Sequence, residues 1–293
     1  MNRTVAAITE MRHALSQRLS MTGTWAKAHY AALERCRDTA ARILGRSEGL
    51  RVLDLGCGRV PHATMVFTAW KWHATGIDIG PVEGTRFSKL AYEVRTEGML
   101  RATKSLARQL IVEPTYYREL ESCAGVPLRN RRLDIRPMSA CDMTFPDGEF
   151  DLIYSMSVLE HIDDVPRALD EVHRVLKDDG LIYISFSPYH SLTGGHSSAW
   201  FRVRQGFIPK DVPAWDHLRE QRFPNPVYLN KLRVSDYRAE LDKRFEILEW
   251  RLTQEGIDLL TPAIRAELAA YTEEELTTRT VTVVARKRAI PPP

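Results

Sequence analysis

The sequence has few cysteines, no long apolar run and almost no net charge, and each shortage rules out a class of protein. The four cysteines are widely spaced and form no CxxC pair, which argues against a disulfide framework or a zinc ribbon and predicts a cytoplasmic protein. No apolar run reaches the roughly 18 residues of a membrane span, and the N-terminus lacks a signal-peptide pattern. A net charge of +3 is too small a bias to predict binding to nucleic acid.

What the chain does have is an alternation of apolar strands and amphipathic helices. The apolar runs predict strands at 51–56, 74–79, 133–139, 150–157 and 181–187, with a helix at 61–72 and another that Asp163 or Asp164 caps. The pattern then predicts a helix at 234–244, a sixth strand at 245–251 and a seventh strand at 280–286, the last of them on an edge of the sheet. This order predicts an α/β fold with a Rossmann-like, doubly wound, mostly parallel seven-stranded sheet.

Three stretches fall outside this alternation. Residues 24–44 carry apolar side chains at steps of three and four, so we expect residues 1–46 to form an N-terminal helical lid on a main domain of residues 47–293. Residues 81–132 and 188–233 are longer than ordinary connections, and connections this long usually carry function or extra helices. We therefore expect a helical insertion at 81–132 and a substrate lid at 188–233.

A glycine-rich turn joins the first strand to the first helix, in the run Val52-Leu53-Asp54-Leu55-Gly56-Cys57-Gly58. Gly56 and Gly58 permit positive φ and let a ligand approach the backbone beside a helix N-terminus. Nicotinamide and flavin enzymes use such a turn too, but here Pro61 replaces the last glycine. Asp54 would also repel a pyrophosphate by ~1–4 kcal/mol at about 4 Å. A carboxylate favours instead a cofactor with an ammonium and a sulfonium group.

Further polar residues follow the next strands. Asp78 ends the second strand, twenty residues past Gly58, where an acid takes the two hydroxyls of a ribose. Asp142 and Met143 follow the third strand, where a carboxylate can accept from an adenine amino group while methionine covers the ring. The fourth strand leads through Ser155 to the carboxyl edge of the sheet, where ligands of such folds bind.

Together, the D-x-G-x-G turn, these acids and the run F-D-L-I-Y-S-M-S-V-L-E-H-I resemble the class I S-adenosylmethionine-dependent methyltransferases. The resemblance covers residues 50–190 well and 234–287 in outline, and Val60 stands where the family has its third glycine. It implies S-adenosylmethionine as cofactor, close to Asp54, Gly56, Cys57, Gly58, Asp78, Ile79, Asp142, Met143 and Ser155. The family often adds an N-terminal helix over the methionine end, for which Trp25, His29 and Tyr30 are candidates; packing of an aromatic helix is the alternative.

The residues after strands four and five predict the chemistry. Glu160 and His161 follow the fourth strand and His196 lies in a glycine-rich loop after the fifth, so these three are the candidates for removing a proton from an alcohol. Packing of His161 is the alternative. Glu160 and His161 with Asp163 and Asp164 also resemble the acidic cluster of metal-assisted quinone O-methyltransferases. That cluster has a further glutamate where this chain has Ser157, so a divalent metal such as Mg²⁺ on Glu160 and His161 is the weaker interpretation.

The predicted lid carries many aromatic residues, which suit stacking on a sugar, although a lid core built from them is the alternative. Its pattern is similar to bacterial methyltransferases acting on glycans and secondary metabolites. The first functional hypothesis is O-methylation of a sugar or glycoside hydroxyl. The others are O- or N-methylation of a small molecule of lipid, quinone or natural-product metabolism, and a non-catalytic cofactor-binding scaffold. The expected partner is a small molecule or glycan, and a homodimer is left open. The aromatic residues are Trp200, Phe201, Phe207, Trp215, Phe223 and Tyr228.

Overall fold

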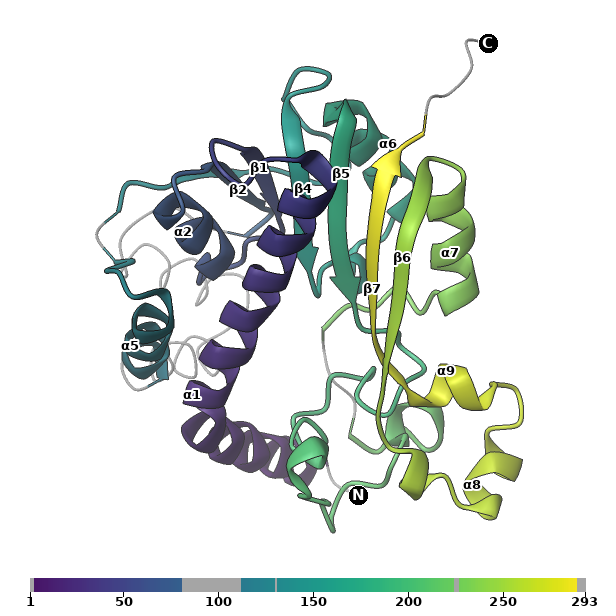
Figure 1. Cartoon of the computed structure of the whole chain (residues 1–293). Coiled ribbons are helices and arrows are strands. Elements are labelled where there is room, and N and C mark those ends of the chain that lie inside the picture. The colour runs from purple at the N-terminus through teal and green to yellow at the C-terminus, as the bar shows by residue number, and fades with distance from the viewer. Residues whose placement is uncertain (1–2, 81–111, 130, 224–226, 289–293) are drawn as a thin grey trace.

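A central seven-stranded sheet carries helices on both faces in the computed structural model, which describes residues 3–80, 112–129, 131–223 and 227–288 (Figure 1). The strand order is β3-β2-β1-β4-β5-β7-β6, and β7 runs antiparallel to both its neighbours while the other pairs are parallel. This order confirms the predicted Rossmann-like fold. The strands are β1 (Arg51–Leu55), β2 (His73–Asp78), β3 (Asp134–Pro137), β4 (Phe150–Met156), β5 (Leu176–Phe186), β6 (Phe245–Gln254) and β7 (Thr278–Lys287).

Two predictions about the strands were wrong. The seventh strand was expected on an edge, but β7 lies between β5 and β6, so β6 is the edge strand. Val283 and Val284, which point to opposite faces of β7, are both fully buried, so helices or strands cover it on each side. The fifth strand was expected at 181–187, but β5 begins five residues earlier, where Leu176 already pairs with Phe150 of β4.

The helices form two layers around the sheet. α1 (Arg3–Leu44), α2 (His62–Ala69) and α5 (Glu113–Ala124) pack on one face, and α6 (Val165–Val175) and α7 (Val234–Asp242) on the other. α6 starts as predicted, because the side chain of Asp164 accepts a hydrogen bond from the amide of Arg167. In the second half of α1, Ala26, Leu33 and Ala40 are completely buried against the sheet, so this half is a layer of the main domain.

The connection from β5 to α7, which includes the predicted lid, has a small core of its own. Leu192, Trp200 and Trp215 pack there against Leu260 and Leu268, which belong to the β6–β7 connection. That connection carries α8 (Pro262–Glu267) and α9 (Glu273–Thr277), which the sequence did not predict. Of the insertion expected at 81–132, residues 81–111 lie outside the described residues, and α5 is the helix found in the rest of it.

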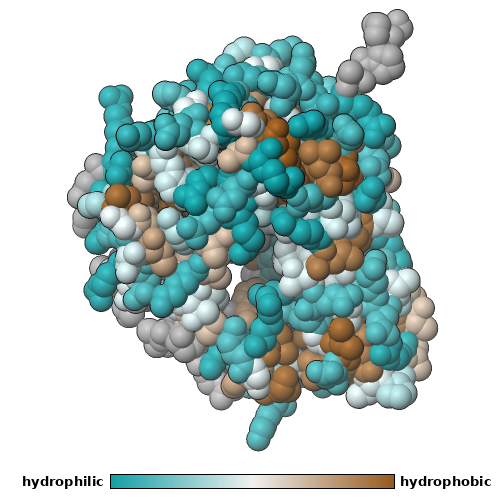
Figure 2. Space-filling model, viewed as in Figure 1, coloured by the Kyte–Doolittle hydropathy of each residue, from teal (hydrophilic) through white to brown (hydrophobic). Residues whose placement is uncertain are grey.

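The long helix α1 also reaches the lid. Figure 1 shows its N-terminal part bending away from the sheet toward the segment after β5. There the His13 ring lies 2.8 Å from the carboxylate of Asp211, measured from Nε2 to Oδ1, and stands edge-on to Phe207. None of the described helices is both long and apolar enough to cross a membrane. On the face drawn in Figure 2, hydrophobic residues form separate patches among hydrophilic ones.

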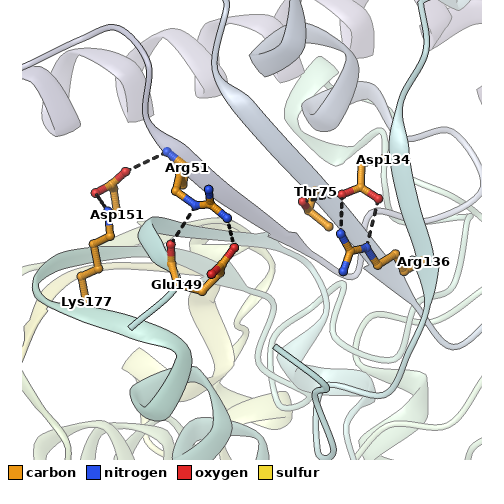
Figure 3. Close-up of polar contacts among 7 residues, drawn as sticks. All are labelled: Arg51, Thr75, Asp134, Arg136, Glu149, Asp151 and Lys177. Atoms are coloured by element: carbon orange, nitrogen blue, oxygen red, sulfur yellow. Dashed lines mark hydrogen bonds and ion pairs between the residues drawn. The ribbon is translucent and has the colours of Figure 1, made fainter. Parts of the chain in front are cut away.

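Ion pairs join neighbouring strands on the sheet away from the glycine turn (Figure 3). The buried carboxylate of Asp151 accepts hydrogen bonds from the Arg51 amide at 2.8 Å and from Lys177 Nζ at 2.7 Å. On β2 and β3, Thr75 and Arg136 both donate to Asp134. The contacts of Asp151 thus link β4 to β1 and to β5, and the Thr75–Asp134 bond links β2 to β3.

Candidate active site

The glycine turn lies at the carboxyl end of β1, where the strand order reverses and ligands of such sheets bind. Gly56 and Gly58 have φ of +75° and +67°, as predicted, and the amides of Gly56 and Cys57 both donate to the carbonyl of Ile77. A Cβ on Gly56 would lie 2.3 Å from Cγ2 of Val158, whereas one on Gly58 would meet nothing within 4 Å. The turn is therefore packed tightly at Gly56 and open at Gly58.

Asp78 ties the end of β2 to this turn. Its Oδ2 accepts from the amide of Gly58 at 2.9 Å, and its Oδ1 accepts from the amide of Gly80 at 2.8 Å. The next side chain, Ile79, is 82% exposed. The backbone of Asp78 also accepts from Met138, which brings the loop carrying the exposed Asp142 toward the same edge. An acid, an apolar side chain and a second acid thus gather where the sequence predicts the adenosine.

Three other predicted cofactor residues are buried in the structure. Asp54 accepts from the amide and the hydroxyl of Thr64, at 3.0 and 2.6 Å, so it satisfies a free amide at the start of α2. Burial raises its pKa to about 6, against the lowering effect of these two bonds. The Ser155 hydroxyl donates to the carbonyl of Leu55, and Met143 packs in the core beneath the sheet. Their described contacts are structural, and a direct contact with the cofactor stays a prediction.

A pocket of about 490 Å³ opens at the carboxyl ends of β4 and β5. The predicted N-terminal helix does contribute to it, through Trp25 and His29. Tyr30 does not: its ring packs against Trp70, beyond the C-terminal end of α2 and so away from the glycine turn that precedes this helix. Core packing therefore accounts for Tyr30. The lining residues are Trp25, His29, Val60, His62, Val112, Glu113, Tyr116, Ser157, Ser187, Thr193, His196, Phe201 and Arg279.

One wall of this pocket is a group of neutral rings that sequence reasoning largely missed. His29 stacks on His62 with ring centroids 4.7 Å apart, and its Nδ1 lies 2.7 Å from the hydroxyl of Tyr116. Burial lowers the pKa of His29 to about 3 and that of His62 to about 4, so both are uncharged at neutral pH. His62 directly follows the glycine turn, which was a usable signal. Tyr116 comes from α5, and nothing in its local pattern pointed to the site.

The predicted catalytic residues form a cluster, and of its three members His196 lines the pocket. Glu160, His161 and His196 each place one oxygen or nitrogen so that all three atoms lie within 4.8 Å of one another. The Oε1 of Glu160 accepts from the amide of Ser187 at 3.1 Å, while its Oε2 is buried and has no hydrogen-bond partner among the described residues. Burial raises the pKa of Glu160 to about 7, and burial with the neighbouring His161 lowers that of His196 to about 4. The structure thus brings the three candidates together.

The backbone around this cluster is held in unusual conformations. Ser157 and His196 have φ of +57° and +55°, which is uncommon for residues other than glycine and clusters at functional sites. Asn230 fixes the turn that carries Glu160. Its side-chain amide donates to the carbonyl oxygens of Leu159 and Ile162, and its backbone amide donates to the carbonyl oxygen of Glu160. Sequence reasoning missed Asn230, since nothing local marks it.

Four further polar residues have partners of their own. Asp164 caps α6, and Asp163 accepts from the amide of Asp164, so the aspartates serve the helix start, which was the preferred interpretation. His190 is buried against the ring of Tyr271 and does not line the pocket. Arg279, which does line it, bonds to the carboxylate of Glu255.

A seven-stranded sheet with β7 antiparallel, a glycine turn at the switch point and an acid at the end of β2 define a class I S-adenosylmethionine-dependent methyltransferase fold. The sequence profile of a methyltransferase domain family matches residues 27–232, and the chain belongs to that family. The match begins inside α1, in agreement with the packing of this helix into the main domain.

Individual relatives are distant. An O-methyltransferase of Aspergillus nomiae, rstn1, is 26% identical over 154 residues, which are 53% of this chain and 54% of that protein. The chloroplastic tocopherol O-methyltransferase of Arabidopsis thaliana is 25% identical over 169 residues, 56% of this chain and 39% of that protein. The chain thus spans about half the length, or less, of these relatives. The solved structure of YcgJ from Bacillus subtilis superposes with a TM-score of 0.48 at 17% identity, over 89% of this chain and 100% of that chain.

Proposed function

We propose that the protein transfers a methyl group from S-adenosylmethionine to a hydroxyl group of a small molecule bound in the 490 Å³ pocket. The observation that carries this proposal is the cluster of Glu160, His161 and His196, which reaches the pocket through His196. An alcohol is a poor nucleophile until its proton is removed, and a carboxylate with neutral imidazoles can accept that proton. An amine that is already unprotonated would need no such group, because its lone pair can attack directly.

The residues at the edge of β1 and β2 fit the cofactor. The open space at Gly58 admits a ligand against the backbone, Asp78 offers carboxylate oxygens to ribose hydroxyls, and Ile79 offers an exposed apolar face to a base. When bound there, the cofactor supplies an activated methyl group on a positively charged sulfur. The chain's own task is then to align the acceptor oxygen with that methyl group, since positioning supplies much of the rate.

The aromatic lid no longer favours a sugar as acceptor. Trp200 and Trp215 are buried in the lid's own core, and of the six aromatic residues considered only Phe201 lines the pocket. Packing therefore accounts for most of the pattern on which the sugar hypothesis depended. The relatives named O-methyltransferases agree with hydroxyl methylation without naming an acceptor for this chain.

The cofactor half of the proposal is tested by calorimetry. S-adenosylhomocysteine should bind, NAD should not, and Asp78→Ala should weaken the binding by roughly 10–150-fold, the loss of about 1.5–3 kcal/mol expected for charged hydrogen bonds. Circular dichroism checks that the variant is folded. Tight NAD binding without an S-adenosylhomocysteine signal would refute the cofactor assignment.

The reaction half is tested by turnover with panels of alcohols, phenols, glycosides and amines. For the best hydroxyl acceptor, His196→Gly should lower kcat by roughly 10²–10⁴-fold, while S-adenosylhomocysteine affinity changes little because the cofactor contacts are expected from Gly58, Asp78 and Ile79. Glycine is the suitable replacement because the backbone at His196 is left-handed. Turnover confined to amines would overturn the hydroxyl assignment, and no turnover with any acceptor in the panels would favour a scaffold.

A further inference from the structure

The cluster of Glu160, His161 and His196 has the composition of a metal site as well as of a proton acceptor. One ligand atom from each residue lies within 4.8 Å of the others. A tetrahedral ion with bonds of ~2.1 Å holds its ligands about 3.4 Å apart, so small side-chain rotations would close these three around one ion. The three come from two separate segments, because Glu160 and His161 follow β4 while His196 belongs to the lid.

A second observation points independently to a ligand. Glu160 is 1% exposed, and its Oε2 has no hydrogen-bond partner among the described residues, although Oε1 is satisfied by Ser187. Leaving a buried carboxylate oxygen unpaired costs about 1–3 kcal/mol or more, so such an atom needs a partner. A bound cation would provide one.

The surroundings also prepare His161 for coordination. Its Nδ1 lies 2.9 Å from the carbonyl oxygen of Tyr228. A carbonyl only accepts, so Nδ1 carries a hydrogen, which leaves Nε2 as the nitrogen that can bind a metal. Metal-binding histidines commonly have this arrangement, in which the second nitrogen donates to a carbonyl and fixes the ring.

The ligand types select the metal. Mg²⁺ prefers oxygen ligands in an octahedral shell and keeps several waters. Two imidazoles with one carboxylate suit Zn²⁺ and neighbouring transition ions instead, and this ligand set is used in catalytic zinc sites that leave a position open for water or substrate. His196 lines the pocket, so the open position would face the acceptor.

We propose that Glu160, His161 and His196 bind one divalent transition-metal ion of the zinc type, which joins the lid to the end of β4. This inference deepens the proposed function, since an ion in this position would polarise the acceptor hydroxyl in place of a free histidine base. It differs from the Mg²⁺ site considered from the sequence both in its metal and in the participation of His196.

The test measures metal binding without cofactor or turnover. Protein stripped with a chelator is titrated with Zn²⁺ and with Mg²⁺ by calorimetry, and with Co²⁺ by visible absorption. One equivalent of Zn²⁺ and of Co²⁺ should bind, with no comparable Mg²⁺ binding, and Zn²⁺ should raise the melting temperature. His196→Gly and Glu160→Gln should each weaken Zn²⁺ binding by more than ~100-fold, because loss of a ligand costs more than loss of a group that orients one.

The matched control is His73→Ala, which removes an exposed histidine at the start of β2 and should leave Zn²⁺ binding unchanged. If Glu160→Gln fails to fold, His196→Gly still decides the question, because glycine tolerates the backbone angle there. Absence of stoichiometric Zn²⁺ binding, equal affinity in these variants, or equally tight Mg²⁺ binding would overturn the metal site. If turnover falls in the variants while the wild type binds no Zn²⁺, the methyltransferase function stands and the metal site does not.

Discussion

Gly56 is the residue at which sequence and structure agree most directly. The sequence predicted positive φ in the turn, and the structure adds that Val158, at the end of β4, occupies the space of a missing Cβ. The same contact explains why this turn and the β4 loop keep a fixed relation to each other.

Gly56→Ala should therefore lower the free energy of unfolding by about 2–4 kcal/mol, the combined cost of a left-handed alanine and of overpacking against Val158. Gly58→Ala is the matched comparison, because it has the same backbone strain and open space at its Cβ, and should cost only about 1–2 kcal/mol. Urea denaturation measures both. Adding Val158→Ala to Gly56→Ala should recover the difference in stability between Gly56→Ala and Gly58→Ala. Equal losses of stability in Gly56→Ala and Gly58→Ala would contradict the clash with Val158.

Asp54 shows what a local pattern cannot convey at the scale of single residues. The sequence placed a carboxylate beside two glycines and suggested a contact with a cationic ligand. In the structure the carboxylate faces α2, where the amide and hydroxyl of Thr64 reach it. Ten residues separate the two partners, so only the fold brings them together.

Among the elements, the strands of the inner sheet were predictable and the outer pairing was not. The strands β1, β2, β4 and β5 are largely apolar and buried on both faces. A short run of apolar residues between turn residues predicts such a strand from the sequence. The position of β7 depends on which strands accept its backbone, a choice made by tertiary packing. The short helices α8 and α9 did carry start signals, Thr261 before a proline and a Thr272–Glu275 capping box, which sequence reasoning missed. Their packing onto the lid through Leu268, just after α8, and Leu276 is set by the fold.

The short turn after β4 depends on Asn230 for its position, so this residue is expected to act on catalysis through Glu160. Asn230→Ala leaves the carbonyls of Leu159 and Ile162 without their donor, and should lower the free energy of unfolding by about 2–3 kcal/mol. It should also reduce kcat while S-adenosylhomocysteine affinity stays nearly unchanged. Urea denaturation, turnover and calorimetry measure the three quantities.

Tyr237→Phe is the control for Asn230. It removes only the hydroxyl that donates to Asn230 Oδ1, so about 1 kcal/mol of stability should be lost and kcat should fall much less. If Asn230→Ala lowers stability and leaves kcat as it was, the residue supports the fold without positioning Glu160.

For the whole molecule, the buried titratable groups favour opposite responses to acid. Four histidines have pKa values lowered to about 4 or below, about 3 for His29 and about 4 for His62, His196 and His217, and burial also lowers the pKa of His190. Histidine in the unfolded chain titrates near pH 6.5. Below that pH the unfolded chain binds protons that the folded chain does not bind, so the free energy of unfolding falls. Two carboxylates, Asp54 at about 6 and Glu160 at about 7, bind protons in the folded state first, so acid stabilises the fold through them.

The four histidines outnumber the two carboxylates, so the metal-free protein should lose stability as the pH falls from about 6.5 to 4. Near pH 5 the net difference is about two protons, which gives a slope of roughly 2–3 kcal/mol per pH unit. Urea denaturation at pH 7, 6 and 5 measures it. His29→Gln should flatten the slope by about one proton, or ~1.4 kcal/mol per pH unit. Stability that stays level or rises on acidification would mean that the stacked histidines beside the pocket are not held in their neutral form.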